Sequence, residues 1–453
     1  MCRLLSCVVT LSFWYLGFVG SQLSGHIPAC KDIASMIRDP EDAAKVRGTI
    51  PAAPEMRNLR VCSGNTTCCS VEAEAAFLRQ TGADFSSHYE NTNDPLYSYI
   101  ATQIKNLKGR LQDIIEVTLS TVITMLEISF PQMPHQFRRP LRYFLTDLSH
   151  YVTKSSSAYN QSAYVQAVTH NFFSDIFPTF FRCVLQGSCG GDSAELSPEV
   201  ASCLRSRLVA TARPFGGIPD QLGHDLSLGL SLLRLYLRSL ELLNELIVHN
   251  PFAEFSQKSS FSQPPSHFLP TSSCRQGLAR FGLCSMCGPV NPLVGTVPGC
   301  KNFCTNVVMA CLTEGGLSTV SDVWDKTIEI ANQLATASAI SALDHSWSVL
   351  LDRLEEGFLM AASRRSELLQ RASVECGVSY DQTHHLHRSQ WKKKNATRAF
   401  RSTKRLRLVD GFQTTTKQLS GYVGWFRSLD SSFCDQTANQ YCWNGEEIAR
   451  SVV

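Results

Sequence analysis

The sequence predicts an all-α protein, built as an elongated helical bundle with a disulfide-rich N-terminal lobe. Apolar residues recur every three or four positions over long stretches, and almost no stretch alternates with a period of two. The cysteines fall in clusters that long helical stretches separate. With 453 residues, of which 43% are hydrophobic, the chain is long enough to bury a large core.

The chain begins with a pattern typical of a secretory signal peptide, which we place at residues 1–21. Arg3 gives a positive start, an apolar run follows from Leu4 to Val19, and small residues end it. The alternative is a membrane anchor, but the run is short for a transmembrane span. The apolar stretch 226–248 does not compete, because it contains four charged side chains. We therefore expect an extracellular protein.

Four segments carry the helical pattern. Asp94 and Pro95 look like an N-cap and a first turn, and an apolar stripe continues from them for more than thirty residues, about 45 Å of helix. Ser197 and Pro198 open a second helix in the same way. Residues 226–248 are apolar nearly all round, so we expect them at the centre of the bundle. The fourth pattern covers about 323–369, and its expected core residues are Trp324, Ile328, Ile340, Leu343, Trp347, Leu350, Leu351 and Leu354.

Cysteine usage indicates a disulfide framework. Of 18 cysteines, Cys2 and Cys7 lie in the signal peptide, and an even number remains, which in an exported chain predicts eight disulfides. These are Cys30, Cys62, Cys68, Cys69, Cys183, Cys189, Cys203, Cys274, Cys284, Cys287, Cys300, Cys304, Cys311, Cys376, Cys434 and Cys442. The spacing does not give their connectivity. Zinc binding at 284–311 is the alternative, but thiols in a secreted chain would oxidise first.

No catalytic site, metal site or cofactor is expected. The chain has no paired-carboxylate motif, no glycine-rich phosphate loop and no Gly-x-Ser-x-Gly sequence. No activated cysteine with a partner histidine is apparent. A secreted disulfide-rich hydrolase therefore remains only as an alternative without candidate residues.

A strongly basic segment lies at 377–410, where we expect an exposed loop. It contains nine cations and no acid between its first and last arginine, namely Arg388, Lys392, Lys393, Lys394, Arg398, Arg401, Lys404, Arg405 and Arg407. Taking these nine from the net charge of +3 leaves −6 for the rest of the chain. Arg398 and Arg401, followed by Ser402, fit the minimum site of a furin-like convertase. The alternatives are a solvated loop and a sulfated polysaccharide as ligand, whereas nucleic acid is not expected outside the cell.

Three sequons predict N-glycosylation, at Asn65, Asn160 and Asn395. Residues 251–273 are rich in Ser, Pro and Phe and are expected to form a second loop.

The ordered motifs resemble the glypican family. Val61-Cys62 with Thr67-Cys68-Cys69 is similar to its N-terminal signature, and Arg213-Pro214-Phe215-Gly216 is similar to the segment after its central cysteine. The motifs of its later cysteine block are matched by Leu283-Cys284-Ser285-Met286-Cys287-Gly288, Gly299-Cys300-Lys301-Asn302-Phe303-Cys304 and Ala310-Cys311-Leu312. Cys442-Trp443-Asn444-Gly445 matches the family's "CWNG" motif. The motifs keep their order over residues 30–446.

The resemblance implies a disulfide pairing. It joins Cys30 to Cys68, Cys62 to Cys284, Cys69 to Cys287, Cys203 to Cys376, Cys274 to Cys311, Cys300 to Cys442 and Cys304 to Cys434. Cys183 and Cys189 are then left over, and we expect a local bridge between them. Because disulfides would join both sides of the loop, cleavage is not expected to release the C-terminal piece.

The resemblance also implies a division of the chain into parts. The core covers 22–446, with a cysteine-rich lobe at 30–75 plus 274–320, a helical body at 90–250 and 320–376, the basic cleavage loop at 377–410, a C-terminal helix with closing cysteines at 411–446, and the start of a tail at 447–453.

Glypicans are cell-surface co-receptors that carry covalent heparan sulfate and a lipid anchor in the outer leaflet of the plasma membrane. The resemblance implies binding of Wnt, Hedgehog, BMP and FGF-type ligands. The sequence stops at Val453 without an acidic Ser-Gly cluster or a hydrophobic tail, so the heparan sulfate attachment residue stays unknown. We expect a truncated record or a secreted variant, and a soluble decoy without glycan or anchor is the alternative function.

Overall fold

The computed structural model describes most of the chain. The described residues are 30, 32–51, 55–62, 67–130, 134–154, 162–187, 196–248, 271–287, 297–314, 317–379, 411–434 and 441–450. The chain divides into two compact units. The smaller unit comprises Met1–Gly82, Arg275–Val307 and Gln436–Val453, and the larger comprises Ala83–Cys274 and Val308–Asp435.

Helices dominate both units, as the sequence predicts. In chain order they are η1 (Ile33–Met36), α1 (Pro40–Arg47), α2 (Val71–Ser129), α3 (Pro134–Thr153), α4 (Ser162–Phe180), η3 (Phe181–Leu185), α5 (Pro198–Cys203), η4 (Leu204–Leu208), α6 (Val209–Ala212), α7 (Ile218–Val248), α8 (Ser272–Gly282), η6 (Cys284–Met286), α9 (Lys301–Glu314), α10 (Leu317–Leu334), α11 (Ala337–Ser363), α12 (Arg365–Cys376), α14 (Phe412–Ser420) and α15 (Trp425–Phe433). The strands β1 (Tyr441–Trp443) and β2 (Ile448–Arg450) form an antiparallel hairpin.

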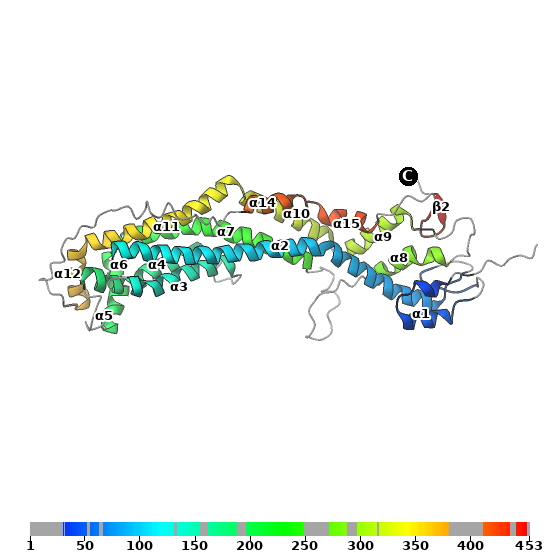
Figure 1. Ribbon diagram of the computed structural model, residues 1–453, viewed down its shortest axis with the longest axis horizontal. Helices are drawn as coiled ribbons and strands as arrows, with labels where there is room; N and C mark the ends of the chain where they lie inside the picture. The colour runs from blue at the N-terminus through cyan, green and yellow to red at the C-terminus, as the bar shows by residue number, and fades with distance from the viewer. Residues whose placement is uncertain are drawn as a thin grey trace, which may run out of the picture. The chain divides into compact units, whose positions relative to one another are not determined.

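The larger unit is a bundle around α7. Helices α3, α4, α7 and α11 run side by side, and α7 contacts α3, α4, α10 and α11 (Figure 1). Leu226, Leu233 and Leu240 of α7 are buried in this packing. The prediction that this apolar helix occupies the centre of the bundle is therefore confirmed.

Aromatic side chains fill one region of this core. Phe358 of α11 lies 5.1 Å from Phe137, 5.6 Å from Phe180 and 6.0 Å from Phe215, measured between ring centroids. Such edge and offset contacts add to the free energy gained by burial. This cluster explains Phe215 in the Arg-Pro-Phe-Gly motif, because the turn after α6 inserts its ring among the other aromatic rings.

The turn itself depends on two unusual backbone conformations. Arg213 has φ 42° and ends α6 in the left-handed region, and Gly216 follows with φ 59°. Glycine is favoured there because this φ is strained for residues with a Cβ atom, and such an atom would also displace the Met360 side chain, whose sulfur would lie 2.5 Å away.

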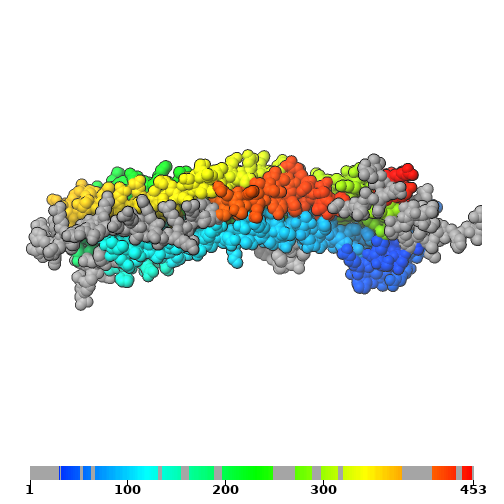
Figure 2. Space-filling model, turned by 45° about the horizontal axis from the view of Figure 1, so that its top comes forward, coloured from blue at the N-terminus to red at the C-terminus, as the bar shows by residue number. Residues whose placement is uncertain are grey.

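The C-terminal helices α14 and α15 also belong to the larger unit. Both contact α10, and the segment lies across the face of this unit between α2 and α11, where Figure 2 shows it in orange. The smaller unit has its own core, in which cysteines take part beside Ile33, Val46, Val61 and Phe77.

One expectation about the elements needs correction. Pro95 does not start a helix but lies inside α2, because buried residues on both sides of it (Tyr89 and Leu96) keep the helix continuous. The pattern at 323–369 is divided among α10, α11 and α12, with breaks at Thr336 and Arg364. A short hairpin at 441–450, too short to show alternation, accompanies the predicted all-α fold.

Candidate ligand-binding surface and disulfide framework

Six disulfides join segments that lie far apart in the sequence. The smaller unit contains Cys30–Cys68, Cys62–Cys284, Cys69–Cys287 and Cys300–Cys442, and the larger contains Cys203–Cys376 and Cys274–Cys311. These are six of the pairs that the family resemblance implies. Cys284 and Cys287, which could have been zinc ligands, are therefore engaged in bridges.

Cys183, Cys304 and Cys434 are disulfide-bonded as well. Cys189 lies outside the described residues, so its bridge to Cys183 stays a prediction, as does the pairing of Cys304 with Cys434. Within the described ranges, no group of three or more His, Cys, Asp or Glu side chains could hold a metal ion.

A buried carboxylate organises the backbone next to the first bridges. Glu74 of α2 is 3% exposed, and it accepts hydrogen bonds from the backbone N–H groups of Arg60, Val61 and Cys62 at 2.9, 2.6 and 3.0 Å. Hydrogen bonds to an ionised acceptor are stronger than those between neutral groups. Glu74 thus positions Cys62 for its bridge to Cys284.

One line of leucines on α7 is exposed, although most apolar side chains of this helix are buried. Leu228, Leu235 and Leu242 are 56%, 54% and 38% exposed. They are seven residues apart, so they lie on one side of the helix and span about 21 Å. We call these three residues the leucine stripe.

Contacts on both sides of α7 fix the orientation of this stripe. Toward α3, Ser231 bonds to the hydroxyl of Tyr151 at 2.9 Å, and Arg238 donates to the carbonyl of Thr153 at 3.1 Å. Toward α11, Gly229 lies so close to Ser346 that a Cβ atom on it would be 2.6 Å from the Ser346 side chain. With these sides engaged, the leucine stripe faces solvent.

The leucine stripe was not predicted from the sequence. A helix that is apolar nearly all round predicts full burial. The seven-residue recurrence of the stripe gives no signal, because buried Leu226, Leu233 and Leu240 recur at the same spacing.

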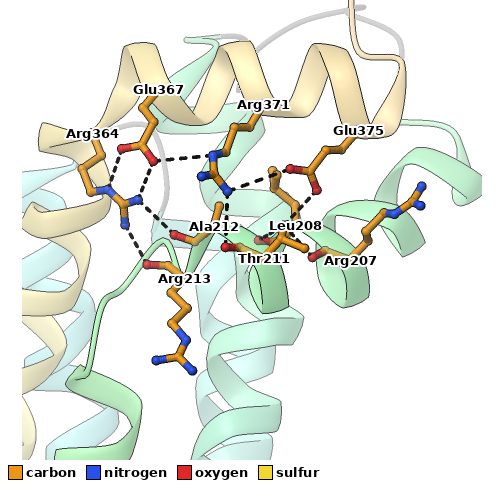
Figure 3. Close-up of polar contacts among 9 residues, drawn as sticks. All are labelled: Arg207, Leu208, Thr211, Ala212, Arg213, Arg364, Glu367, Arg371 and Glu375. Carbon is orange, nitrogen blue, oxygen red and sulfur yellow. Dashed lines mark hydrogen bonds and ion pairs between the residues drawn. The ribbon is translucent and has the colours of Figure 1, made fainter.

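Helix α12, which precedes the basic loop, is fixed by a polar network (Figure 3). Arg364 donates to the carbonyl oxygens of Arg213 and Ala212 at 2.8 and 3.0 Å and pairs with Glu367 at 2.7 Å. Hydrogen bonding to Arg364 holds the pKa of Glu367 below its usual range. Glu375 accepts from the hydroxyl of Thr211 at 2.8 Å. Together with Cys203–Cys376, these contacts attach α12 to α5 and α6.

The remaining predicted sites cannot be placed. The signal peptide at 1–21, the sequon residues Asn65, Asn160 and Asn395, and the convertase site at Arg398, Arg401 and Ser402 lie outside the described residues, as do most of the two expected loops. Among the helices of the described ranges, none has the length and apolar character to span a bilayer.

Comparisons with known proteins give one consistent answer. A family model described as Glypican matches residues 28–452. Human Glypican-5 is 22% identical over 452 residues, which cover 96% of this chain and 72% of that protein. Mouse Glypican-2 is 21% identical, with 78% of this chain and 56% of that protein covered.

Solved structures agree with this family. A crystal structure of C-terminally truncated glypican-1 matches with a TM-score of 0.63 at 18% identity, and covers 94% of this chain and 88% of its own. Dally-like protein in complex with O-palmitoleoyl serine matches with a TM-score of 0.54 at 15% identity, over 94% of this chain and 88% of its own. With the family model matching nearly its whole length, this chain belongs to the glypican family and is a proteoglycan core protein.

Proposed function

We propose that this protein is a cell-surface co-receptor that binds secreted morphogens and growth factors of the Wnt, Hedgehog, BMP and FGF classes. It would regulate their signalling by concentrating or sequestering them, with no catalytic step of its own. Membership of a family of extracellular cell-surface proteins supports this proposal. Covalent heparan sulfate and an anchor in the outer leaflet belong to the same proposal for the full-length protein.

The leucine stripe is the observation that carries the proposal. An exposed line of three leucines, on a helix whose other leucines are buried or half-buried, is costly unless a ligand covers it, because each side chain leaves apolar surface in water. Its length of about 21 Å suits an extended apolar segment or a fatty acyl chain. The acyl ligand of the Dally-like complex supports an acyl group as one part of the ligand.

The test is a matched pair of triple variants. Leu228→Gln, Leu235→Gln and Leu242→Gln remove the stripe, whereas Val117→Gln, Ile128→Gln and Tyr143→Gln replace three apolar residues exposed elsewhere in the larger unit. Binding of an acylated Wnt protein to each immobilised core is measured by biolayer interferometry. We expect the first set to weaken binding by at least about tenfold and the second to leave it unchanged. Equal affinity of all three proteins would refute the role of the stripe.

The alternative is a soluble decoy that lacks heparan sulfate and a lipid anchor. The natural product distinguishes the two functions. Digestion with heparan lyase shifts the electrophoretic mobility of a proteoglycan and leaves that of a glycan-free decoy unchanged. A phospholipase that cuts lipid anchors should release the anchored proteoglycan from cells, whereas a soluble decoy has no anchor for it to cut.

We further propose the covalent features that the structure leaves untested. These are removal of residues 1–21, glycans at Asn65, Asn160 and Asn395, bridges Cys304–Cys434 and Cys183–Cys189, and cleavage by a furin-like convertase after Arg401. Peptide mapping under non-reducing conditions tests all of them. A new N-terminus at Ser402, sensitive to a convertase inhibitor, is the expected sign of processing, and an intact 377–410 peptide would exclude it.

A further inference from the structure

The bridge Cys203–Cys376 differs from the other disulfides in its exposure. Both of its cysteines are half-buried, whereas each of the other five bridges that the structure describes in full has at least one buried cysteine. These buried cysteines are Cys62, Cys68, Cys69, Cys274, Cys284, Cys287, Cys311 and Cys442. The bonded cysteines whose partners are not placed, Cys183, Cys304 and Cys434, are at most 3% exposed. Cys203–Cys376 is therefore the described bridge that a thiol in solution reaches most readily.

The surface around this bridge is open on both sides. Cys203, the last residue of α5, lines an open hollow together with Pro198, Glu199, Ser202, Ser206 and Arg207. These five neighbours are all exposed. On the other side, Cys376 ends α12 and is followed by Gly377, where an added Cβ atom would meet nothing within 4 Å. No packed side chain therefore closes the approach to the bridge at either of these places.

Two opposite charges line the hollow. Arg207 would attract an incoming thiolate, and Glu199 would repel it. The guanidinium of Arg207 points away from Glu375 of α12, as Figure 3 shows. A third charge, Arg205, is instead paired with Asp175 of α4 at 3.0 Å. Arg207 and Glu199 are therefore the charges through which the protein influences attack on Cys203.

We infer that Cys203–Cys376 is a thiol-exchange site, which an extracellular protein with two neighbouring thiols opens. A thiolate of that dithiol attacks Sγ of Cys203, the bond to Sγ of Cys376 breaks, and Cys376 leaves as a thiolate that takes up a proton. The second thiol of the dithiol then attacks the mixed disulfide and releases Cys203 as a thiol. The dithiol is oxidised to a disulfide, and its two electrons reduce the bridge.

Other contacts keep α12 in place after the bridge opens. Arg364 donates to the carbonyl of Ala212, and Glu375 accepts from the hydroxyl of Thr211, both in α6. Val378, just beyond the bridge, is 6% exposed and anchors the end of the helix. The bridges of the smaller unit differ in this respect, because their cysteines form part of its core. Opening of Cys203–Cys376 is thus local and can be reversed.

A time course of reduction tests the inference on the full chain. The protein is treated with reduced thioredoxin, a protein dithiol, and the free thiols are blocked with N-ethylmaleimide at each time. Mass spectrometry of the digested samples then identifies the labelled cysteines. We expect Cys203 and Cys376 to be labelled first, at a rate at least roughly tenfold above that of any other pair. Labelling of another pair at the same rate would overturn the inference.

Two variants of opposite sign test the direction of attack. At low ionic strength, Arg207→Gln should slow the labelling of Cys376 by about twofold, and Glu199→Gln should accelerate it by about twofold. Both effects should disappear in about 1 M salt. Arg205→Gln is the control and should leave the rate unchanged, since Asp175 already pairs with this arginine. A shift in the same direction for Arg207→Gln and Glu199→Gln would contradict attack through the hollow.

The fold of the opened protein is measured in the same time course. Helical circular dichroism should stay unchanged while only Cys203 and Cys376 are labelled, and its loss at this stage would contradict a local opening. A variant with both Cys203→Ser and Cys376→Ser should fold and show no labelling in the early phase. Early labelling of other cysteines in this variant would mean that the bridge protects the rest of the protein rather than acting as a site of exchange.

Discussion

The two units of this protein are stabilised in different ways. The smaller unit has short helices and a core in which Cys62, Cys68, Cys69, Cys284 and Cys287 are themselves buried members. The larger unit has long helices around α7 and a cluster of phenylalanines around Phe358. A unit with little apolar core needs covalent cross-links, whereas a large bundle can rely on packing. From this difference we expect the smaller unit to lose structure when disulfides are removed and the larger unit to lose structure when core side chains are truncated.

The largest expected effect is loss of the two parallel bridges Cys62–Cys284 and Cys69–Cys287, which close loops of 222 and 218 residues. Replacing all four cysteines by serine should cost on the order of 5 kcal/mol, because the unfolded chain regains the entropy of a very long loop. Removing one bridge alone should cost only about 2–3 kcal/mol, since the other still closes the loop.

Hydrogen exchange checks this prediction. Protection should be lost in Ile33–Met36 and Pro40–Arg47 and retained in α7. Equal loss of protection in both units would contradict the proposed difference between them.

A matched change in the larger unit is Phe358→Ala. It removes a fully buried ring from the aromatic cluster and should lower the free energy of unfolding by about 3–5 kcal/mol. Urea denaturation measures the change. Val374→Ala on α12, where the side chain is 82% exposed, is the control and should stay within about 0.5 kcal/mol. A comparable loss in the control would show that the cluster is not what stabilises this unit.

Glu74→Gln tests the buried carboxylate of the smaller unit. The amide keeps the shape but weakens the acceptor for the N–H groups of Arg60, Val61 and Cys62. We expect a loss of about 1.5–3 kcal/mol, detected as faster exchange of these three amides. Unchanged exchange there would mean that the bridges alone fix this backbone.

The smallest effect is a pH dependence in the larger unit. Hydrogen bonds from Ser273 and Thr271 hold the pKa of Glu314 below its usual range. A lowered folded pKa stabilises the protein above the ordinary value near 4.5 and loses this contribution as the pH falls through the folded pKa. Glu314→Gln should flatten the acid limb of a stability-versus-pH curve relative to the unsubstituted protein. Parallel curves for the variant and the unsubstituted protein would exclude the proposed role of Glu314.

Periodicity predicted the fold class, and the nearly all-round apolar character of residues 226–248 predicted the central position of α7. It misplaced the start of α2, since the local signal of Asp94 and Pro95 is overridden by buried neighbours such as Tyr89. The breaks at Thr336 and Arg364 were missed because neither is a glycine or a proline. Tertiary contacts decide these boundaries, and a single sequence does not contain them.

The candidate site was less predictable than the fold. The cysteine set could be read from the sequence, but its pairing needed the family resemblance. The leucine stripe was hidden, because Leu228, Leu235 and Leu242 have the same side chain as their buried neighbours. Only the helices packed against α7 determine which leucines stay exposed.

Our central claim is that the larger unit binds the ligand through the leucine stripe while the smaller unit is a cross-linked scaffold. Hydrogen exchange of the full chain with and without an acylated Wnt protein tests it most directly. We predict new protection in α7 around Leu228–Leu242 and none in residues 33–62. Protection confined to the smaller unit, with α7 unchanged, would contradict the claim.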